Sequence, residues 1–99
     1  MRISLRQLQI FIAIAKSGST TAAGEQIALS QSAISASIAE LERALNVQLF
    51  DRVGKRLQLN DHGRAMLSQA MAVVNSAESL EHAFLDEQAV IPDYLIKKN

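Results

Sequence analysis

Cysteine and tryptophan are both absent from this chain of 99 residues, and proline occurs once. Without cysteine there is no disulfide, no thiolate zinc site and no cysteine nucleophile. The chain also has no uninterrupted apolar run of the roughly 18 residues that a membrane span needs, and no pattern of a cleaved signal peptide. With 48% hydrophobic residues it is not a disordered tail. We expect one small domain with one extra element, in a cytoplasmic protein without a membrane partner.

Net charge is also lacking, but only because two halves of opposite sign cancel. Residues 1–64 hold eight basic and five acidic residues, a balance of +3, whereas residues 65–99 hold two basic and five acidic residues, a balance of −3. A locally basic half is compatible with nucleic acid. The excess is small, so we expect one copy to bind weakly and a dimer to bind better.

Residues 19–45 have the pattern of two short helices joined by a tight turn, the layout of a helix-turn-helix DNA reader. Ser30 is placed to cap the second of these helices, and Ile34 begins a buried stripe that continues at spacings of four, three and four residues. The outer side and its flank carry small polar or apolar side chains that can approach base edges: Gln31, Ser32, Ser35, Ala36 and Ala39, with Arg43 beyond them. The alternative is a Ser/Ala-rich helix packed against another part of a small helical core.

The flanking residues predict where the neighbouring helices begin and end. Ser4 and Gln7 have the spacing of a capping box for a helix over residues 5–17, and Gly18 is suited to end it. Ser19 or Thr20 can cap the next helix. Asn46 tolerates the positive φ that ends the third.

After residue 46 the period changes to the alternation of a short hairpin. Residues 53–56 form its predicted turn, and Arg52, Lys55 and Arg56 lie at its tip and flank. These cations could contact phosphates or a minor groove, or they could simply be solvated.

A long helix is predicted over residues 61–88, with Asn60 as its N-cap. It would extend about 42 Å, more than a domain of this size can cover, so a second copy is the simplest partner for its apolar stripe. The alternative is a helix folded back on the first helix, through Leu67 and Val74. The stripe has coiled-coil spacing and consists of Met66, Ala70, Val73, Ala77, Leu80 and Phe84.

Catalytic and metal-binding patterns are weak. His62 and His82 are isolated on the predicted long helix, with no carboxylate pair and no glycine-rich loop near them in sequence. We therefore predict neither an enzyme nor a metal or cofactor site.

The order of these elements, together with the string SQSAIS and the following LE, LFDR, VGKR and LQLNDHG, resembles the DNA-binding domain of LysR-type transcriptional regulators over residues 3–88. The resemblance implies a mainly α fold: a winged helix-turn-helix of three helices and a two-stranded wing over residues 1–60, then a dimerisation helix over residues 61–88. Residues 89–99 are then a hinge or tail toward an effector-binding domain that the chain lacks. Full regulators of this family often assemble as tetramers.

The resemblance also implies roles for single residues. Gln31, Ser32, Ser35 and Ala36 match positions that face the major groove, with Gln31 as the main reader. Hydroxyl groups at the start of the second helix would position phosphates, and they belong to Ser19, Thr20 and Thr21. Three residues depart from the family pattern: Ser32 replaces proline, Ala36 replaces arginine or lysine, and Asn46 replaces glycine. The missing cation at position 36 would shift specificity toward the remaining readers and DNA shape.

The predicted function is sequence-specific binding of a two-fold double-stranded DNA operator by a homodimer of a bacterial transcription regulator. The alternative is a coiled-coil interaction module that pairs with related regulators without binding DNA itself.

Overall fold

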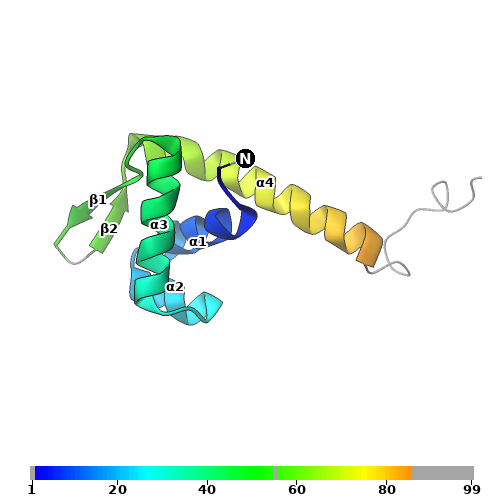
Figure 1. Cartoon of the computed structure of the whole chain (residues 1–99), viewed down its shortest axis with the longest axis horizontal. Coiled ribbons are helices and arrows are strands. Elements are labelled where there is room, and N and C mark those ends of the chain that lie inside the picture. The colour runs from blue at the N-terminus through cyan, green and yellow to red at the C-terminus, as the bar shows by residue number, and fades with distance from the viewer. Residues whose placement is uncertain (1, 55, 86–99) are drawn as a thin grey trace, which may run out of the picture.

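The structure is a computed structural model, and it describes residues 2–54 and 56–85. Three helices are followed by a hairpin and a long fourth helix that projects from the body (Figure 1). The elements are α1 (Leu5–Ser17), α2 (Thr20–Ile27), α3 (Gln31–Leu45), β1 (Phe50–Val53), β2 (Arg56–Leu59) and α4 (Asp61–Leu85). The predicted fold class, a winged helix-turn-helix followed by a long helix, is confirmed. The predicted tail, residues 89–99, lies outside the described residues.

Side chains fix the helix ends where the sequence predicts them. Ser4 and Gln7 form the capping box of α1, and Gly18 ends this helix with φ +78°. The hydroxyl of Ser30 accepts a hydrogen bond of 3.1 Å from the N–H of Ala33. Asn46 ends α3 with φ +57°. These local bonds satisfy backbone groups that a helix end leaves free.

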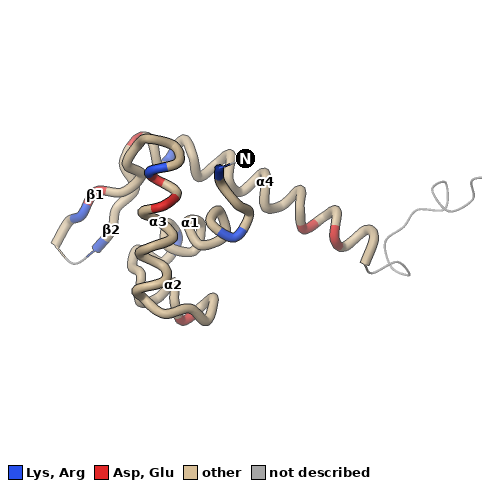
Figure 2. Tube along the Cα trace, viewed as in Figure 1, with Lys and Arg blue, Asp and Glu red and all other residues tan. Residues whose placement is uncertain are grey.

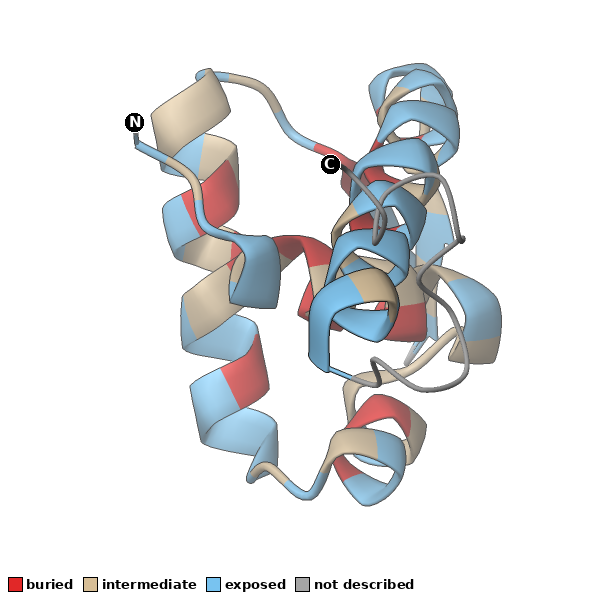
Figure 3. Cartoon of the chain, turned by 90° about the vertical axis from the view of Figure 1, so that its right-hand side faces the viewer, coloured by how far each residue is buried: buried red, intermediate tan, exposed pale blue. Residues whose placement is uncertain are grey.

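The core lies where α1 meets the inner faces of the other three helices (Figure 3). Its largest fully buried side chains are Phe11, Ile14, Ile34, Leu41 and Leu49. The predicted inward stripe of α3 is therefore buried at its first three positions, Ile34, Ile38 and Leu41, whereas Leu45 is only half-buried.

The wing is an antiparallel hairpin in which Val53 pairs with Arg56 across a two-residue connection. Gly54 in that connection has φ +65°, the left-handed conformation that such tight turns require. The wing is tied to the helical body because the N–H of Leu57 donates to the carbonyl of Gly18 at 3.3 Å. At its base, Phe50 packs edge-on against Phe11 with 5.5 Å between ring centroids.

Helix α4 packs against α1 with its first half only, and its second half continues alone into solvent (Figure 1). Leu67 and Val74 pack on the chain's own core, as the fold-back alternative predicts, and so does Ala70, which is 2% exposed. The predicted apolar stripe thus divides: Met66 and Ala70 contact the core, whereas its later part is more open. Of that later part Ala77 is half-buried, and Val73, Leu80 and Phe84 are 50%, 61% and 61% exposed.

None of the helices in residues 2–54 and 56–85 is both long enough and apolar enough to cross a membrane.

Candidate nucleic-acid interface

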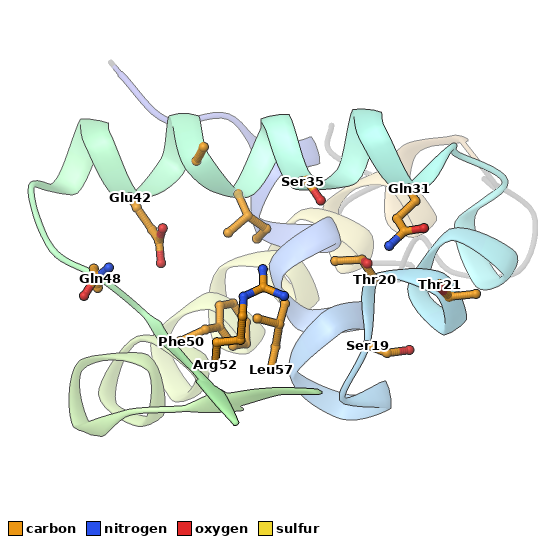
Figure 4. Close-up of a pocket in the computed structure, with 12 residues that line it drawn as sticks. Ser19, Thr20, Thr21, Gln31, Ser35, Glu42, Gln48, Phe50, Arg52 and Leu57 are labelled. Atoms are coloured by element: carbon orange, nitrogen blue, oxygen red, sulfur yellow. The ribbon is translucent and has the colours of Figure 1, made fainter. Parts of the chain in front are cut away.

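A polar hollow of about 370 Å³ lies between α3, the start of α2 and the wing (Figure 4). It brings together residues that are far apart in the chain. Six of the ten residues predicted to contact DNA line this hollow: Ser19, Thr20, Thr21, Gln31, Ser35 and Arg52.

The start of α2 forms one end of the hollow. The hydroxyl of Ser19 accepts a hydrogen bond of 3.0 Å from the N–H of Ala22, so Ser19 is the N-cap. Thr20 and Thr21 follow in the first turn, where backbone N–H groups and the helix dipole favour an anion. This end of the hollow can therefore hold a phosphate.

Helix α3 forms the upper wall in Figure 4. Gln31 and Ser35 are exposed, and both face the hollow from the first half of the helix. Ser32 and Ala36 are exposed on the same helix but are not part of the lining. The small side chains leave the helix backbone accessible to a groove, as the pattern predicts.

The predicted wing cations separate into different places. Arg52 extends from β1 into the hollow, opposite α3 (Figure 4). Arg56 is exposed at the start of β2, and its guanidinium reaches back to the α1–α2 turn, where a β-carbon added at Gly18 would lie 3.3 Å from Nη2. Lys55 lies outside the described residues. The wing thus contributes one cation to the hollow and a second one beside its α2 end.

In the part of the chain that the structure describes, charge is divided in the direction that the sequence predicts. Cations lie on the wing, at the start of α1 and near the end of α3, whereas the far half of α4 carries only acidic residues among its strongly charged ones (Figure 2). Within the described residues, no group of three or more histidine, aspartate or glutamate side chains is placed to hold a metal ion.

Sequence reasoning missed two polar residues of the hollow, Glu42 and Gln48. The carboxylate of Glu42 accepts a hydrogen bond of 2.8 Å from the N–H of Leu49. Helical spacing was the available signal, because Glu42 lies seven residues after Ser35 and therefore on the same side of α3. Gln48 follows the helix in an irregular segment, where no periodicity indicates the direction of a side chain.

The turn between α2 and α3 is built around close backbone contact. A β-carbon at Gly24 would lie 2.6 Å from the carbonyl oxygen of Leu29, so a larger residue there would push the two helices apart. Ala28 ends α2 with φ +56°. This turn holds the start of α3 next to the start of α2, which is the arrangement that DNA-binding helix-turn-helix units share.

Helix-turn-helix units of this kind occur in several protein families, and sequence similarity identifies the family of this chain. A sequence model described as bacterial regulatory helix-turn-helix protein, lysR family, matches residues 5–64. The chain belongs to the lysR family. The match covers α1, the helix-turn-helix and the wing, and extends into the first turn of α4.

Relatives in the lysR family are transcriptional regulators. The HTH-type transcriptional regulator YeiE of Escherichia coli K12 is 50% identical over 94 residues, which are 95% of this chain and 32% of YeiE. The RuBisCO operon transcriptional regulator of Allochromatium vinosum is 38% identical over 81 residues, which are 82% of this chain and 27% of that protein. The chain therefore spans between about a quarter and a third of the length of these relatives.

Solved structures of lysR-family proteins have the same fold. The DNA-binding domain of CbnR, solved in complex with DNA, superposes with a TM-score of 0.74 at 33% identity, covering 77% of this chain and 87% of that domain. Oxidised OxyR of Corynebacterium glutamicum superposes with a TM-score of 0.78 at 32% identity, covering 84% of this chain and 27% of OxyR. The chain corresponds to the DNA-binding domain of a lysR-family regulator.

Proposed function

We propose that this chain binds a two-fold double-stranded DNA site sequence-specifically, as a dimer, and that it is the DNA-binding part of a transcription regulator. The hollow that joins the start of α2, the open face of α3 and Arg52 carries the proposal, since it combines a helix N-terminus that favours an anion, exposed polar side chains and a cation. The comparisons give no support to an interaction module that does not bind DNA.

In the proposed complex, the first half of α3 enters the major groove. Gln31 can donate and accept at once and so pair with the two edge groups of adenine, while Ser35 contacts a neighbouring base. One DNA backbone then passes over the hollow, with a phosphate at Thr20 and Thr21 and another at Arg52. The rest of the wing, with Arg56, follows the adjacent minor groove.

The dimer forms, in this proposal, through the open half of α4. Leu80 and Phe84 are each 61% exposed, and Leu85 is 80% exposed, so three large apolar side chains lie on a short stretch of helix. Burying them against a second copy removes apolar surface from water. A two-fold dimer then presents two copies of α3 to two half-sites.

The proposal assigns no catalytic activity to this chain and places it in the cytoplasm. A protein that binds the bacterial chromosome works in the cytoplasm.

The test is selection of bound duplexes from a randomised library, followed by fluorescence anisotropy of the selected duplex at two salt concentrations. We expect a two-fold site. Gln31→Ala should relax the base preference in each half-site at a cost of about 1–3 kcal/mol on the preferred sequence. Arg52→Ala should weaken binding to all duplexes by a similar factor, because a phosphate contact carries no base preference.

Matched controls come from the surface away from the hollow. Gln69 is exposed on α4 and Arg6 is exposed on α1, so Gln69→Ala and Arg6→Ala should bind the selected duplex as the unmodified chain does. No enrichment of any sequence by a folded, dimeric chain at low salt would refute the proposal and favour the interaction module.

A further inference from the structure

A chain of hydrogen bonds leads from α3, through the segment before β1, to the start of α4. It begins at Glu42, half-buried on α3, whose carboxylate accepts a hydrogen bond of 2.8 Å from the N–H of Leu49. The carbonyl of Leu49 then accepts from the backbone N–H of Asn60 at 3.1 Å. Leu49 is 1% exposed, so water does not readily replace these partners.

The side-chain amide of Asn60 extends this series of hydrogen bonds into α4 through both its nitrogen and its oxygen. Its Nδ2 donates to the carbonyl of Gln48 at 2.9 Å, and its Oδ1 accepts from the N–H of Gly63 at 2.8 Å. Gly63 itself lies against the carbonyl of Leu49, so closely that a β-carbon there would clash with that oxygen. Helix α3, the end of the wing and the start of α4 therefore meet at one short segment, Gln48–Leu49.

This junction lies between the part of the molecule proposed to contact DNA and the part proposed to form the dimer. Helix α3 faces the hollow, whereas α4 carries the open apolar half. A hydrogen bond to a carboxylate is about twice as strong as a neutral one. The Glu42 bond is therefore suited to hold the direction of α4 relative to α3.

We propose that Glu42 and Asn60 are positioning residues that set the half-site spacing a dimer of this chain accepts. The inference rests on the proposed dimeric DNA binding. Adding one base pair between half-sites moves them apart by about 3.4 Å and rotates one relative to the other by about 35°. A rigid junction rejects such a change, whereas a loosened junction lets each α3 follow its half-site.

The experiment measures binding to the selected duplex and to versions whose central spacing is one or two base pairs shorter or longer. The unmodified chain should lose at least about tenfold in affinity when the spacing changes by two base pairs, which corresponds to about 1.4 kcal/mol. Glu42→Ala should reduce this loss to about threefold or less, because the Gln48–Leu49 segment can then shift between α3 and the start of α4. Glu42→Gln keeps a hydrogen-bond acceptor, so its loss of affinity on changing the spacing should stay within about twofold of the loss of the unmodified chain.

Two further variants separate positioning from folding and from charge. Asn60→Asp keeps the oxygen that caps α4 but loses the donor to Gln48, so it should fold normally and still relax the spacing preference. Glu40→Ala removes the same charge from an exposed position of α3 and should retain the preference.

Each outcome decides a different point. If Glu42→Ala and Asn60→Asp keep the spacing preference of the unmodified chain, or lower affinity by one common factor at every spacing, the positioning role is wrong and the proposed DNA binding stands. If the unmodified chain binds no duplex, both proposals fail. If Glu42→Ala does not fold, Asn60→Asp decides the question.

Discussion

Gly63 lies inside a helix although glycine has a low helix propensity. Glycine inside a helix is less favourable than alanine by about 1 kcal/mol, because it loses more backbone freedom on folding. Gly63 nevertheless lies in the first turn of α4 and is buried between Leu49 and Leu59. The close approach of α4 to the segment before β1 requires a residue without a side chain.

Gly63→Ala should therefore destabilise the chain although alanine is the better helix former. We expect a loss of about 1–3 kcal/mol in the free energy of unfolding, the usual cost of forcing extra volume into a packed contact. Chemical denaturation followed by circular dichroism measures it. Ser76→Ala, at an exposed position of α4, is the control and should stabilise slightly. An equal gain from both variants would show that the contact is not tight.

Residue types with a strong local signal are the ones that sequence reasoning placed correctly. Gly18 and Asn46 were predicted to adopt positive φ, and both do. Ala28 also has positive φ, but alanine gives no such signal, because only the geometry of the α2–α3 turn imposes it. The direction of Arg56 toward Gly18 was missed for the same reason, since it depends on how the wing docks.

Among the elements, α4 lies in two different environments, the core of the domain and the solvent. Its first half is part of the core, and its second half has Leu80, Phe84 and Leu85 in the open. Because the two halves have different neighbours, changes in the second half should alter association without altering the fold of the chain.

Leu80→Asp combined with Phe84→Asp should yield a folded monomer. Burying two charges in an apolar interface is costly, so we expect the dissociation constant of the dimer to rise by at least about a hundredfold. Sedimentation velocity measures the assembly, and circular dichroism checks the fold. Ser76→Asp combined with Ser79→Asp adds the same charge to exposed polar positions of α4 and should remain more dimeric. A chain that is monomeric before any change would contradict the proposed use of α4.

Element types and ends were predictable because caps and periodicity are local. The ranges of α1 and of the hairpin turn agree with the sequence prediction. The division of α4 was not predictable, because an apolar stripe has the same spacing whether α1 or a second copy covers it. Ala70 illustrates this: it was assigned to the dimer stripe, yet its burial needs no partner.

For the whole molecule, the separation of charge matters more than its sum of zero. The wing and the body around α3 hold the described cations together with several acidic residues, whereas the far half of α4 holds only acidic ones among its strongly charged residues (Figure 2). In the proposed complex DNA therefore meets the end that holds the cations, while the acidic end points along α4 away from the hollow (Figures 1 and 2).

Salt should accordingly weaken DNA binding steeply, in proportion to the number of phosphates contacted. In a plot of log affinity against log salt concentration, Arg52→Ala should reduce the slope by about one per protomer and about two per dimer. Arg6→Ala, which removes a cation from the exposed start of α1, should leave the slope unchanged. Fluorescence anisotropy over a salt series measures both. Equal slopes for Arg52→Ala and the unmodified chain would mean that Arg52 contacts no phosphate.

The bond from Leu57 to the carbonyl of Gly18 has a consequence for the DNA itself. Gly18 directly precedes Ser19, the N-cap of α2, so the wing is held next to the end of α2 that we propose binds a phosphate. In the proposed complex, the separation between the wing and this end of α2 selects one groove width, and a duplex with another groove width must deform to bind. Sequences whose minor groove already has the matching width, such as stiff A-tracts in the case of a narrow one, are favoured at base pairs that no side chain touches.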